Sequence, residues 1–229
     1  MNFPLSANIS SIRFPEGPQH LPTGLEPLSQ DFYARPPEAV APSLLGKLLV
    51  RRFADQLLIG RIVEDEAYLG QNDPAAHAFA GRTARNDVLF GPPGRAYIYF
   101  IYGMHYCLNV SCEPDGQAGG VLFRALEPVA GLEQMAALRN LPAGAEPRLL
   151  TSGPGRLCQA LAITREGHNG TDLTSPSSKL FIAQDGFLPE AIQSSPRVGI
   201  RKATTLPLRF HLKENRFVSA SRPRDLASS

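Results

Sequence analysis

The segment that most constrains the fold covers residues 95–111, with the sequence RAYIYFIYGMHYCLNVS. Its density of aromatic and β-branched residues favours β-strands. Gly103-Met104 interrupts two such runs, and a glycine followed by another residue is typical of a two-residue type II′ hairpin turn. The sequence therefore predicts two antiparallel strands, residues 96–102 and 105–111, joined by a tight turn.

The tip of this hairpin would carry Tyr102 and Met104 rather than the Asn, Asp or Ser residues that are common in solvent-facing turns. Two interpretations are open from the hairpin alone. The tip could fold back beneath another element of the protein. Alternatively, its apolar side chains could be inserted between stacked bases of a nucleic-acid duplex.

A second unusual segment, residues 61–70, reads RIVEDEAYLG and looks like a strand with three consecutive acids. Period-two alternation places Glu64, Glu66 and Tyr68 on one face and Asp65 on the other. Buried carboxylates are costly, so a solvated edge strand would explain them. The functional alternative is a cleft that holds a carboxylate beside an aromatic ring, which suits general-base chemistry next to a stacking surface.

The rest of the chain predicts short elements between many turns, in keeping with its 21 Pro and 20 Gly residues. A short helix should open at Pro36-Pro37, and Ser152 is a candidate N-cap for a later helix. Residues 70–93 form a long irregular loop, a kind of segment that is often functional. Further strands are expected at 48–53, 57–68, 120–127, 179–183, 197–199 and 208–212, and further helices at 131–140 and 156–163.

These elements predict an α+β fold: a single compact domain in which a curved, mostly antiparallel sheet carries short helices and a protruding β-hairpin. We expect residues 1–29 to form a flexible N-terminal leader. Residues 30–222 would form the folded domain, and residues 223–229 a C-terminal tail.

Charge and cysteine content narrow the function classes. Residues 1–78 carry 6 basic and 9 acidic side chains, whereas residues 79–229 carry 17 and 12. Most basic residues are arginines, which can bind phosphate through two hydrogen bonds, so nucleic-acid binding is compatible with the sequence. The 3 cysteines follow no metal-binding spacing, so we expect reduced thiols and no metal site. Without a secretion signal or a long apolar run, the protein is expected in the cytoplasm, associated with the nucleoid, or in a nucleus, and not in a membrane.

Several ordered motifs resemble the alkyladenine (3-methyladenine) DNA glycosylase family of base-excision repair. The resemblance extends over residues 32–219. The matching blocks are LLGK (44–47), RIVEDEAYLG (61–70), DPAAHA (73–78), YIYFIYGM (97–104), CLNV (107–110), VLFRALEP (121–128), SGPGRLCQAL (152–161), PRVGI (196–200) and PLRF (207–210).

The resemblance implies a monofunctional glycosylase that flips an alkylated or deaminated purine out of double-stranded DNA and hydrolyses its N-glycosidic bond, leaving an abasic site. Its expected substrates are 3-methyladenine and 7-methylguanine, with hypoxanthine and ethenoadenine as further candidates. Spacing alone does not choose between Glu64 and Glu66 as the general base, and the family match selects Glu66. Arg124 would be the second group that holds the attacking water, with a backbone carbonyl from residues 217–219.

The same resemblance assigns the remaining site residues. Tyr68, His77 and Tyr99 would form walls around the flipped base, and Asn109 would hinder the amino group of normal guanine. Tyr102 would be the intercalating wedge, with Met104 beside it. Without the resemblance, His77 would be interpreted as a polar loop residue, and Arg124 either as a structural residue or as part of a carboxylate site. Candidates for DNA-backbone contacts are Arg82, Arg85, Arg139 and Arg156. No cofactor is implied, and we expect a monomer.

Two other function classes compete with this reading. A non-catalytic module that binds DNA lesions or nucleic acid could use the same hairpin and basic face without needing Glu66. A relative that reuses the fold on RNA or for formyl transfer would prefer other substrates, because a fold alone does not determine function.

Overall fold

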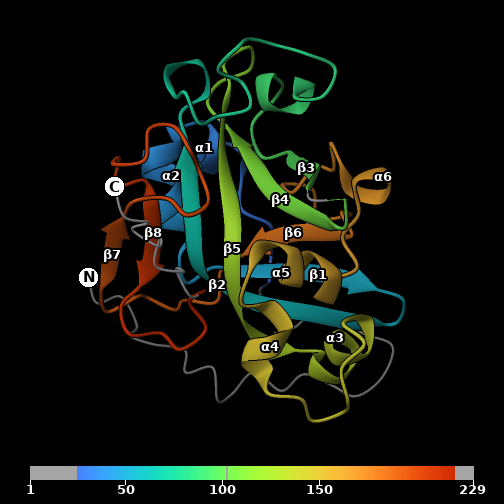
Figure 1. Cartoon of the computed structure of the whole chain (residues 1–229). Coiled ribbons are helices and arrows are strands. Elements are labelled where there is room, and N and C mark those ends of the chain that lie inside the picture. The colour runs from blue at the N-terminus through green and yellow to red at the C-terminus, as the bar shows by residue number, and fades with distance from the viewer. Residues whose placement is uncertain (1–24, 102, 220–229) are drawn as a thin grey trace, which may run out of the picture.

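The computed structural model of the protein describes residues 25–101 and 103–219. Within these ranges the chain forms one antiparallel sheet with the strand order β3-β4-β5-β2-β1-β6, and β8 pairs with both β2 and β7. The strands are β1 (Leu48–Phe53), β2 (Gln56–Tyr68), β3 (Ala96–Ile101), β4 (His105–Cys112), β5 (Gly119–Ala130), β6 (Leu180–Ala183), β7 (Ile192–Ser195) and β8 (Arg209–Leu212). The long strands β2 and β5 run side by side through the centre of Figure 1.

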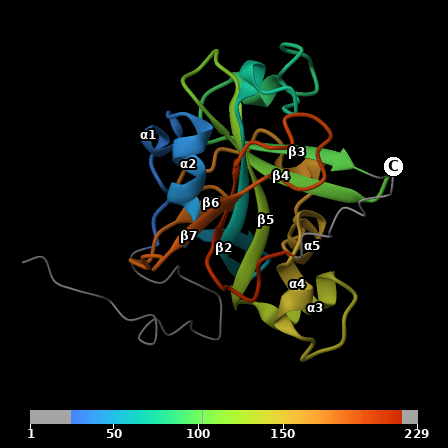
Figure 2. The same cartoon turned by 60° about the vertical axis from the view of Figure 1, so that its left-hand side comes forward.

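Short helices cover the sheet on both faces. Helix α2 packs on β2 and β5, whereas α4 and α5 pack on β5 from the other side, and the helices separate accordingly in Figure 2. The β3–β4 hairpin projects from this body, so the predicted α+β architecture is confirmed. The helices are α1 (Gln30–Tyr33), α2 (Pro37–Leu44), α3 (Leu132–Leu138), α4 (Pro147–Thr151), α5 (Pro154–Ala160) and α6 (Arg165–His168), with 3₁₀ turns at Gly70–Asn72 and Asp87–Phe90.

The acidic segment lies inside the sheet, so the interpretation of an edge strand is wrong. β5 pairs with β2 along one side. On the other side, β1 covers the first half of β2, and β8 pairs with residues 64–66. The side chains of Glu64, Asp65 and Glu66 are all fully buried. Arginines from β5 and β8 pair with two of these carboxylates, Glu64 and Glu66, and this attraction offsets the cost of burying the two charges.

Some local predictions need correction. Ile101 pairs with His105, so three residues, rather than two, connect the strands of the hairpin. Residues 197–199 do not form a strand, and β7 lies earlier in the chain. Ser152 does not cap α5: the helix begins at Pro154, whose ring presets the helical φ, and the Ser152 hydroxyl is buried without a hydrogen-bond partner among the described residues. Helices α4 and α6 lie in segments without a clear helical period.

The chain already packs against the sheet before α1. The Leu28 amide donates to the Ile182 carbonyl at 2.8 Å, and Leu25 and Leu28 are buried. The proposed leader and tail otherwise fall on residues 1–24 and 220–229, outside the described ranges. In the part of the chain that the structure covers, no helix has the length and apolar character needed to cross a membrane.

Candidate active site

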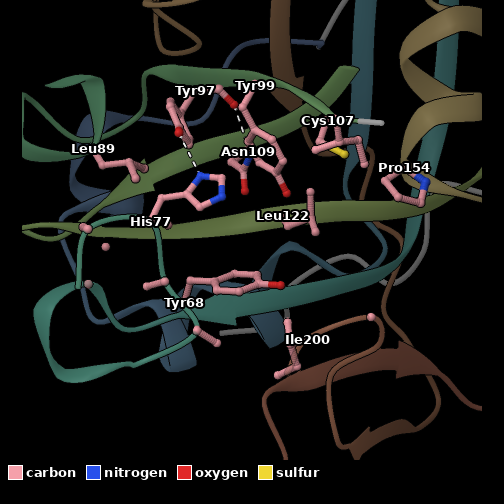
Figure 3. Close-up of a pocket in the computed structure, with 18 of the residues that line it drawn as sticks. Tyr68, His77, Leu89, Tyr97, Tyr99, Cys107, Asn109, Leu122, Pro154 and Ile200 are labelled. Atoms are coloured by element: carbon pink, nitrogen blue, oxygen red, sulfur yellow. Dashed lines mark hydrogen bonds between the residues drawn. The ribbon is translucent and has the colours of Figure 1, made fainter. Parts of the chain in front are cut away.

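A cavity of about 360 Å³ opens where the hairpin meets the ends of β2 and β5. Five segments supply most of its walls: the end of β2, the loop at 75–78, the β3–β4 hairpin, β5, and the irregular segment at 198–200. Gly70, Leu89 and Pro154 complete the lining. Figure 3 shows the Tyr68 ring on one side and His77, Tyr99 and Asn109 on the other. The structure therefore brings together the four residues expected to bind the base.

The wall formed by His77 and Tyr99 is held by Tyr97. The rings of His77 and Tyr99 meet edge to face with centroids 4.5 Å apart. His77 Nδ1 lies 2.9 Å from the Tyr97 hydroxyl oxygen. Burial, with the nearby charge of Arg85, lowers the pKa of His77, which favours a neutral imidazole. A neutral His77 presents a flat surface without adding positive charge to the cavity.

Asn109 is fixed by the same hairpin. Its register partner on β3 is Tyr97, and its Nδ2 donates to the Tyr97 carbonyl oxygen at 3.1 Å. The side chain is 6% exposed and lines the cavity. This bond limits the rotation of the amide, so Asn109 is a rigid steric feature of the wall.

Next to the cavity lies a buried group of two carboxylates. Glu66 Oε1 accepts from the Val198 amide at 2.7 Å and lies 3.2 Å from Arg124 Nη1. The Tyr68 hydroxyl donates to Glu66 Oε2 at 3.0 Å. Glu66 is not in the cavity lining, but Tyr68, Arg124 and Val198 are, so it is one hydrogen bond from the cavity surface.

Glu64 is held far more completely. Its Oε1 accepts from Arg124 Nε at 2.9 Å, Arg209 Nε at 2.7 Å and the Ser219 hydroxyl at 2.9 Å. Its Oε2 accepts from the Ser219 amide at 2.6 Å. None of its contacts other than Arg124 lines the cavity. Glu64 thus ties the end of the described chain to the sheet.

The two environments move the two carboxyl pKa values in opposite directions. Burial raises the pKa of Glu66 and outweighs the opposing effects of Arg124, Val198 and Tyr68. Burial also acts on Glu64, but two arginines and the Ser219 hydroxyl together lower its pKa. Glu66 is therefore the better proton acceptor, because a higher pKa makes the carboxylate a stronger base.

Comparison with known proteins agrees with this geometry. A family model described as methylpurine-DNA glycosylase matches residues 31–216, most of the chain. The chain belongs to the methylpurine-DNA glycosylase family. The resemblance noted from the motifs is thereby confirmed, and with it the assignment to the DNA glycosylases, which act on N-glycosyl bonds.

Individual relatives match most of the chain. A protein of Koribacter versatilis, named as a 3-methyladenine DNA glycosylase, is 58% identical over 198 residues, 86% of this chain and 95% of its own length. One from Carboxydothermus hydrogenoformans with the same name is 49% identical over 84% of this chain and 98% of its own. A third, from Methanocella arvoryzae, is 46% identical over 87% and 98%.

The other predicted residues that the structure describes are not among those that line the cavity. Met104, at the hairpin tip, is 68% exposed, and Tyr102 lies outside the described residues. Arg82 pairs with Asp87 at the surface, and Arg85 is exposed beside it in the chain. Arg139 donates to Gln159 Oε1 at 2.5 Å and to the Leu149 carbonyl at 3.2 Å, and Arg156 is exposed on α5. Two of the four arginines thus lie in the loop before β3, and the other two lie on or beside α5.

Several residues that organise this candidate site were not predicted from the sequence. Tyr97 shares a strand face with Tyr99, so the period-two pattern could have found it. Arg209 and Arg197 lie in the PLRF and PRVGI blocks, but no local pattern shows that they reach Glu64 and Asp73. These partners are more than 100 residues away in the sequence, and only the folded chain brings them together.

Proposed function

We propose that this protein is a monofunctional DNA glycosylase that removes 3-methyladenine, 7-methylguanine and related damaged purines, including hypoxanthine and ethenoadenine, from double-stranded DNA. One observation carries the proposal: a cavity between Tyr68 and the pair His77–Tyr99, with the buried carboxylate of Glu66 one hydrogen bond from its surface. The names of the relatives support the reaction class.

Base recognition follows from the chemistry of the walls. The bond to be broken lies within a stacked duplex, so the nucleotide must flip into the cavity. An alkylated purine is electron-poor, and electron-rich tyrosine rings attract such a base through their faces. Asn109 would restrict the space for the amino group of normal guanine. The wedge residues Tyr102 and Met104 would fill the gap left in the duplex.

The hydrolysis needs one activated water. Glu66, as a carboxylate, accepts a proton from the water while the water oxygen attacks C1′ of the deoxyribose. The bond between C1′ and the purine nitrogen breaks, and its electron pair leaves with the base. Positive charge develops on the sugar, and the nearby carboxylate stabilises it. Arg124 keeps Glu66 oriented through the 3.2 Å contact and would hold the water.

A strand-cleaving reaction would need an amine nucleophile at the sugar. None of the four lysines of the sequence is among the residues that line the cavity in the described chain. The product is therefore an abasic site. We further propose that the protein acts as a monomer on chromosomal DNA, in a nucleoid or a nucleus, and that Arg82, Arg85, Arg139 and Arg156 contact its phosphates.

The test is single-turnover excision from duplex oligonucleotides that each carry one damaged purine, with wild type beside Glu66→Gln. We expect Glu66→Gln to lose at least about 100-fold in rate, the usual lower range for a general base, while lesion binding is retained. Glu127→Gln is a matched control, because Glu127 lies on β5 outside the cavity and, among the described residues, accepts a side-chain hydrogen bond only from Asn215, at 3.1 Å.

The outcomes separate the proposal from its main competitor. Wild type that binds lesions but releases no base from any of them would identify a non-catalytic binding module. Excision by Glu66→Gln at a rate comparable with that of Glu127→Gln would remove Glu66 as the general base.

A further inference from the structure

A buried ion pair joins two of the family motifs outside the residues with proposed roles. Arg197 Nη2 lies 2.8 Å from Asp73 Oδ1, and Nη1 bonds to Asp73 Oδ2. Both side chains are fully buried. Asp73 also accepts from the amides of Leu69 at 3.3 Å and Ala75 at 3.0 Å. The carboxylate therefore fixes the loop that follows β2 and leads to His77.

Arg197 makes two further contacts that lead to the cavity. Nη1 donates to the Ala67 carbonyl at 2.9 Å, and the guanidinium carbon lies 4.5 Å from the centroid of the Tyr68 ring. Tyr68 lines the cavity and Arg197 does not, so Arg197 covers the side of the ring that faces away from the cavity. The ring is thus supported from behind, where a stacked base would press against it.

The position of Arg197 also determines that of the next residue. Val198 donates its amide to Glu66 Oε1 at 2.7 Å, and residues 198–200 line the cavity. The segment has no regular secondary structure to hold it. The contacts of Arg197 with Asp73 and Ala67 anchor its first end beside β2.

Stability alone is a weak explanation for such a pair, because desolvation of two buried charges offsets most of their attraction. The chain contains a matched pair elsewhere. Arg61 bonds to Asp185 at 2.8 and 3.1 Å, donates to the Gly46 carbonyl at 2.7 Å and lies 4.3 Å from the Phe187 ring centroid. Arg61 thus makes the same kinds of contact as Arg197, but neither Arg61 nor any of these partners lines the cavity.

We propose that Asp73 and Arg197 are positioning residues of the active site: together they hold Tyr68 as the rear wall for the flipped base and place the Val198 amide on Glu66. The proposal rests on the proposed function for the identity of the base and of the reaction. Its structural content, the control of Glu66 by the Asp73–Arg197 pair, is independent of that function.

The consequence appears in the protonation of Glu66. Several groups surround it: Arg124 from β5, Glu64, Asp65 and Tyr68 from β2, Tyr99 and Cys107 from the hairpin, and Val198 with Arg197 from the loop. A hydrogen bond to the charged carboxylate lowers its pKa, so loss of the Val198 bond raises the pKa of Glu66 further. A base must be deprotonated, so the acid limb of the pH–rate profile moves to higher pH.

The test uses the double variant Asp73→Asn/Arg197→Gln, which removes both charges and leaves neither one buried alone. We expect the acid limb of single-turnover excision to rise by about one pH unit, equivalent to one lost hydrogen bond to a carboxylate. Lesion binding should weaken in parallel. Arg61→Gln/Asp185→Asn is the matched control and should lower the melting temperature without moving the acid limb.

A second readout does not depend on activity. The carboxyl carbon of Glu66, labelled with ¹³C and assigned by comparison with Glu66→Gln, reports its titration in the free protein by NMR. One outcome is that wild type shows no excision while the Glu66 titration shifts in the Asp73/Arg197 variant and not in the control variant. That result would support the positioning role and contradict the proposed function. An unchanged Glu66 titration, or an equal shift in the control, overturns the positioning role. If the double variant does not fold, Arg197→Lys, which cannot span both Asp73 oxygens, is judged by the same criteria.

Discussion

Asp65 should lower the stability of the protein at neutral pH, and its replacement should reveal how much. The side chain is fully buried, and neither carboxyl oxygen has a hydrogen-bond partner among the described residues. Burial raises its pKa well above the usual value, and the charges of Glu64 and Glu66 add to the effect. Within residues 25–101 and 103–219, Asp65 has no arginine partner, in contrast to both neighbours, so no described cation compensates its desolvation.

The sign and size of the pH effect follow from proton linkage. A carboxyl whose pKa is raised in the folded state binds its proton more tightly there than in the unfolded chain. Its contribution to stability is therefore fully present below the unfolded pKa of about 3.9 and is lost as the pH rises towards the folded pKa. Within this window the loss is about 1.4 kcal/mol per pH unit, the value for one proton.

Two variants separate ionisation from polarity. Asp65→Asn cannot ionise, so its free energy of unfolding should match that of wild type below pH 4. Above pH 4 the variant should become more stable than wild type by about 1.4 kcal/mol for each pH unit. Asp65→Val also removes the unpaired polar group and fits a strand. Its free energy of unfolding should therefore exceed that of Asp65→Asn by about 1 to 3 kcal/mol at every pH.

The assay is urea unfolding followed by circular dichroism between pH 3.5 and 8, in steps of about half a unit, with the slope m compared among variants to confirm two-state behaviour. A constant difference between Asp65→Asn and wild type across this range would show that Asp65 does not titrate differently in the folded state. The reasoning from its buried, unpartnered position would then be refuted.

Two further predictions concern DNA selection. Tyr102→Ala should slow single-turnover excision from duplex DNA by about tenfold or more, because the variant loses a stacking contact. The effect should be smaller on single-stranded substrate. Equal rates for wild type and variant on the duplex would exclude Tyr102 as the intercalating wedge. Asn109→Ala should raise excision of undamaged guanine relative to 7-methylguanine by about tenfold or more, because it removes a fixed steric barrier. An unchanged ratio in competition assays would exclude Asn109 as the barrier.

The parts of the fold that sequence predicted best depend on local patterns. The β1–β2 hairpin and the β3–β4 strands follow from apolar alternation and turn residues, and their observed bounds lie within one residue of the expected ones. The helices α4 and α6 were missed because each has at most five residues, too few for a helical period. Helix α4 buries Leu150 and Thr151, whereas α6 has no buried residue and is capped by the Thr164 side chain, which accepts from the Gly167 amide. Short elements of this kind carry too little sequence signal.

The acidic strand shows why local reasoning fails for charge. Three consecutive acids favour solvent exposure unless cations are present. Arg61, the nearest cation in the sequence, pairs with Asp185 instead. Arg124 is 60 residues away from Glu64, and Arg209 is 145 residues away. Burial of the segment is therefore a property of the closed sheet, and the sequence pattern alone made the exposed edge look more reasonable.

The same distribution of cations gives two chemically identical side chains different pKa values. Glu64 and Glu66 share one strand face, and Arg124 lies between them, so spacing gives them equal standing. Arg209 and Ser219 then bind Glu64 alone, which stabilises its charge and leaves it a weak base. Glu66 has one arginine within salt-bridge distance in the part of the chain that the structure describes, and its pKa stays raised. Its hydrogen bonds reach two residues of the cavity lining, Tyr68 and Val198. The general base that we propose is thus the carboxylate that the fold leaves less neutralised. Arg209→Gln should narrow the difference between the pKa values of Glu64 and Glu66.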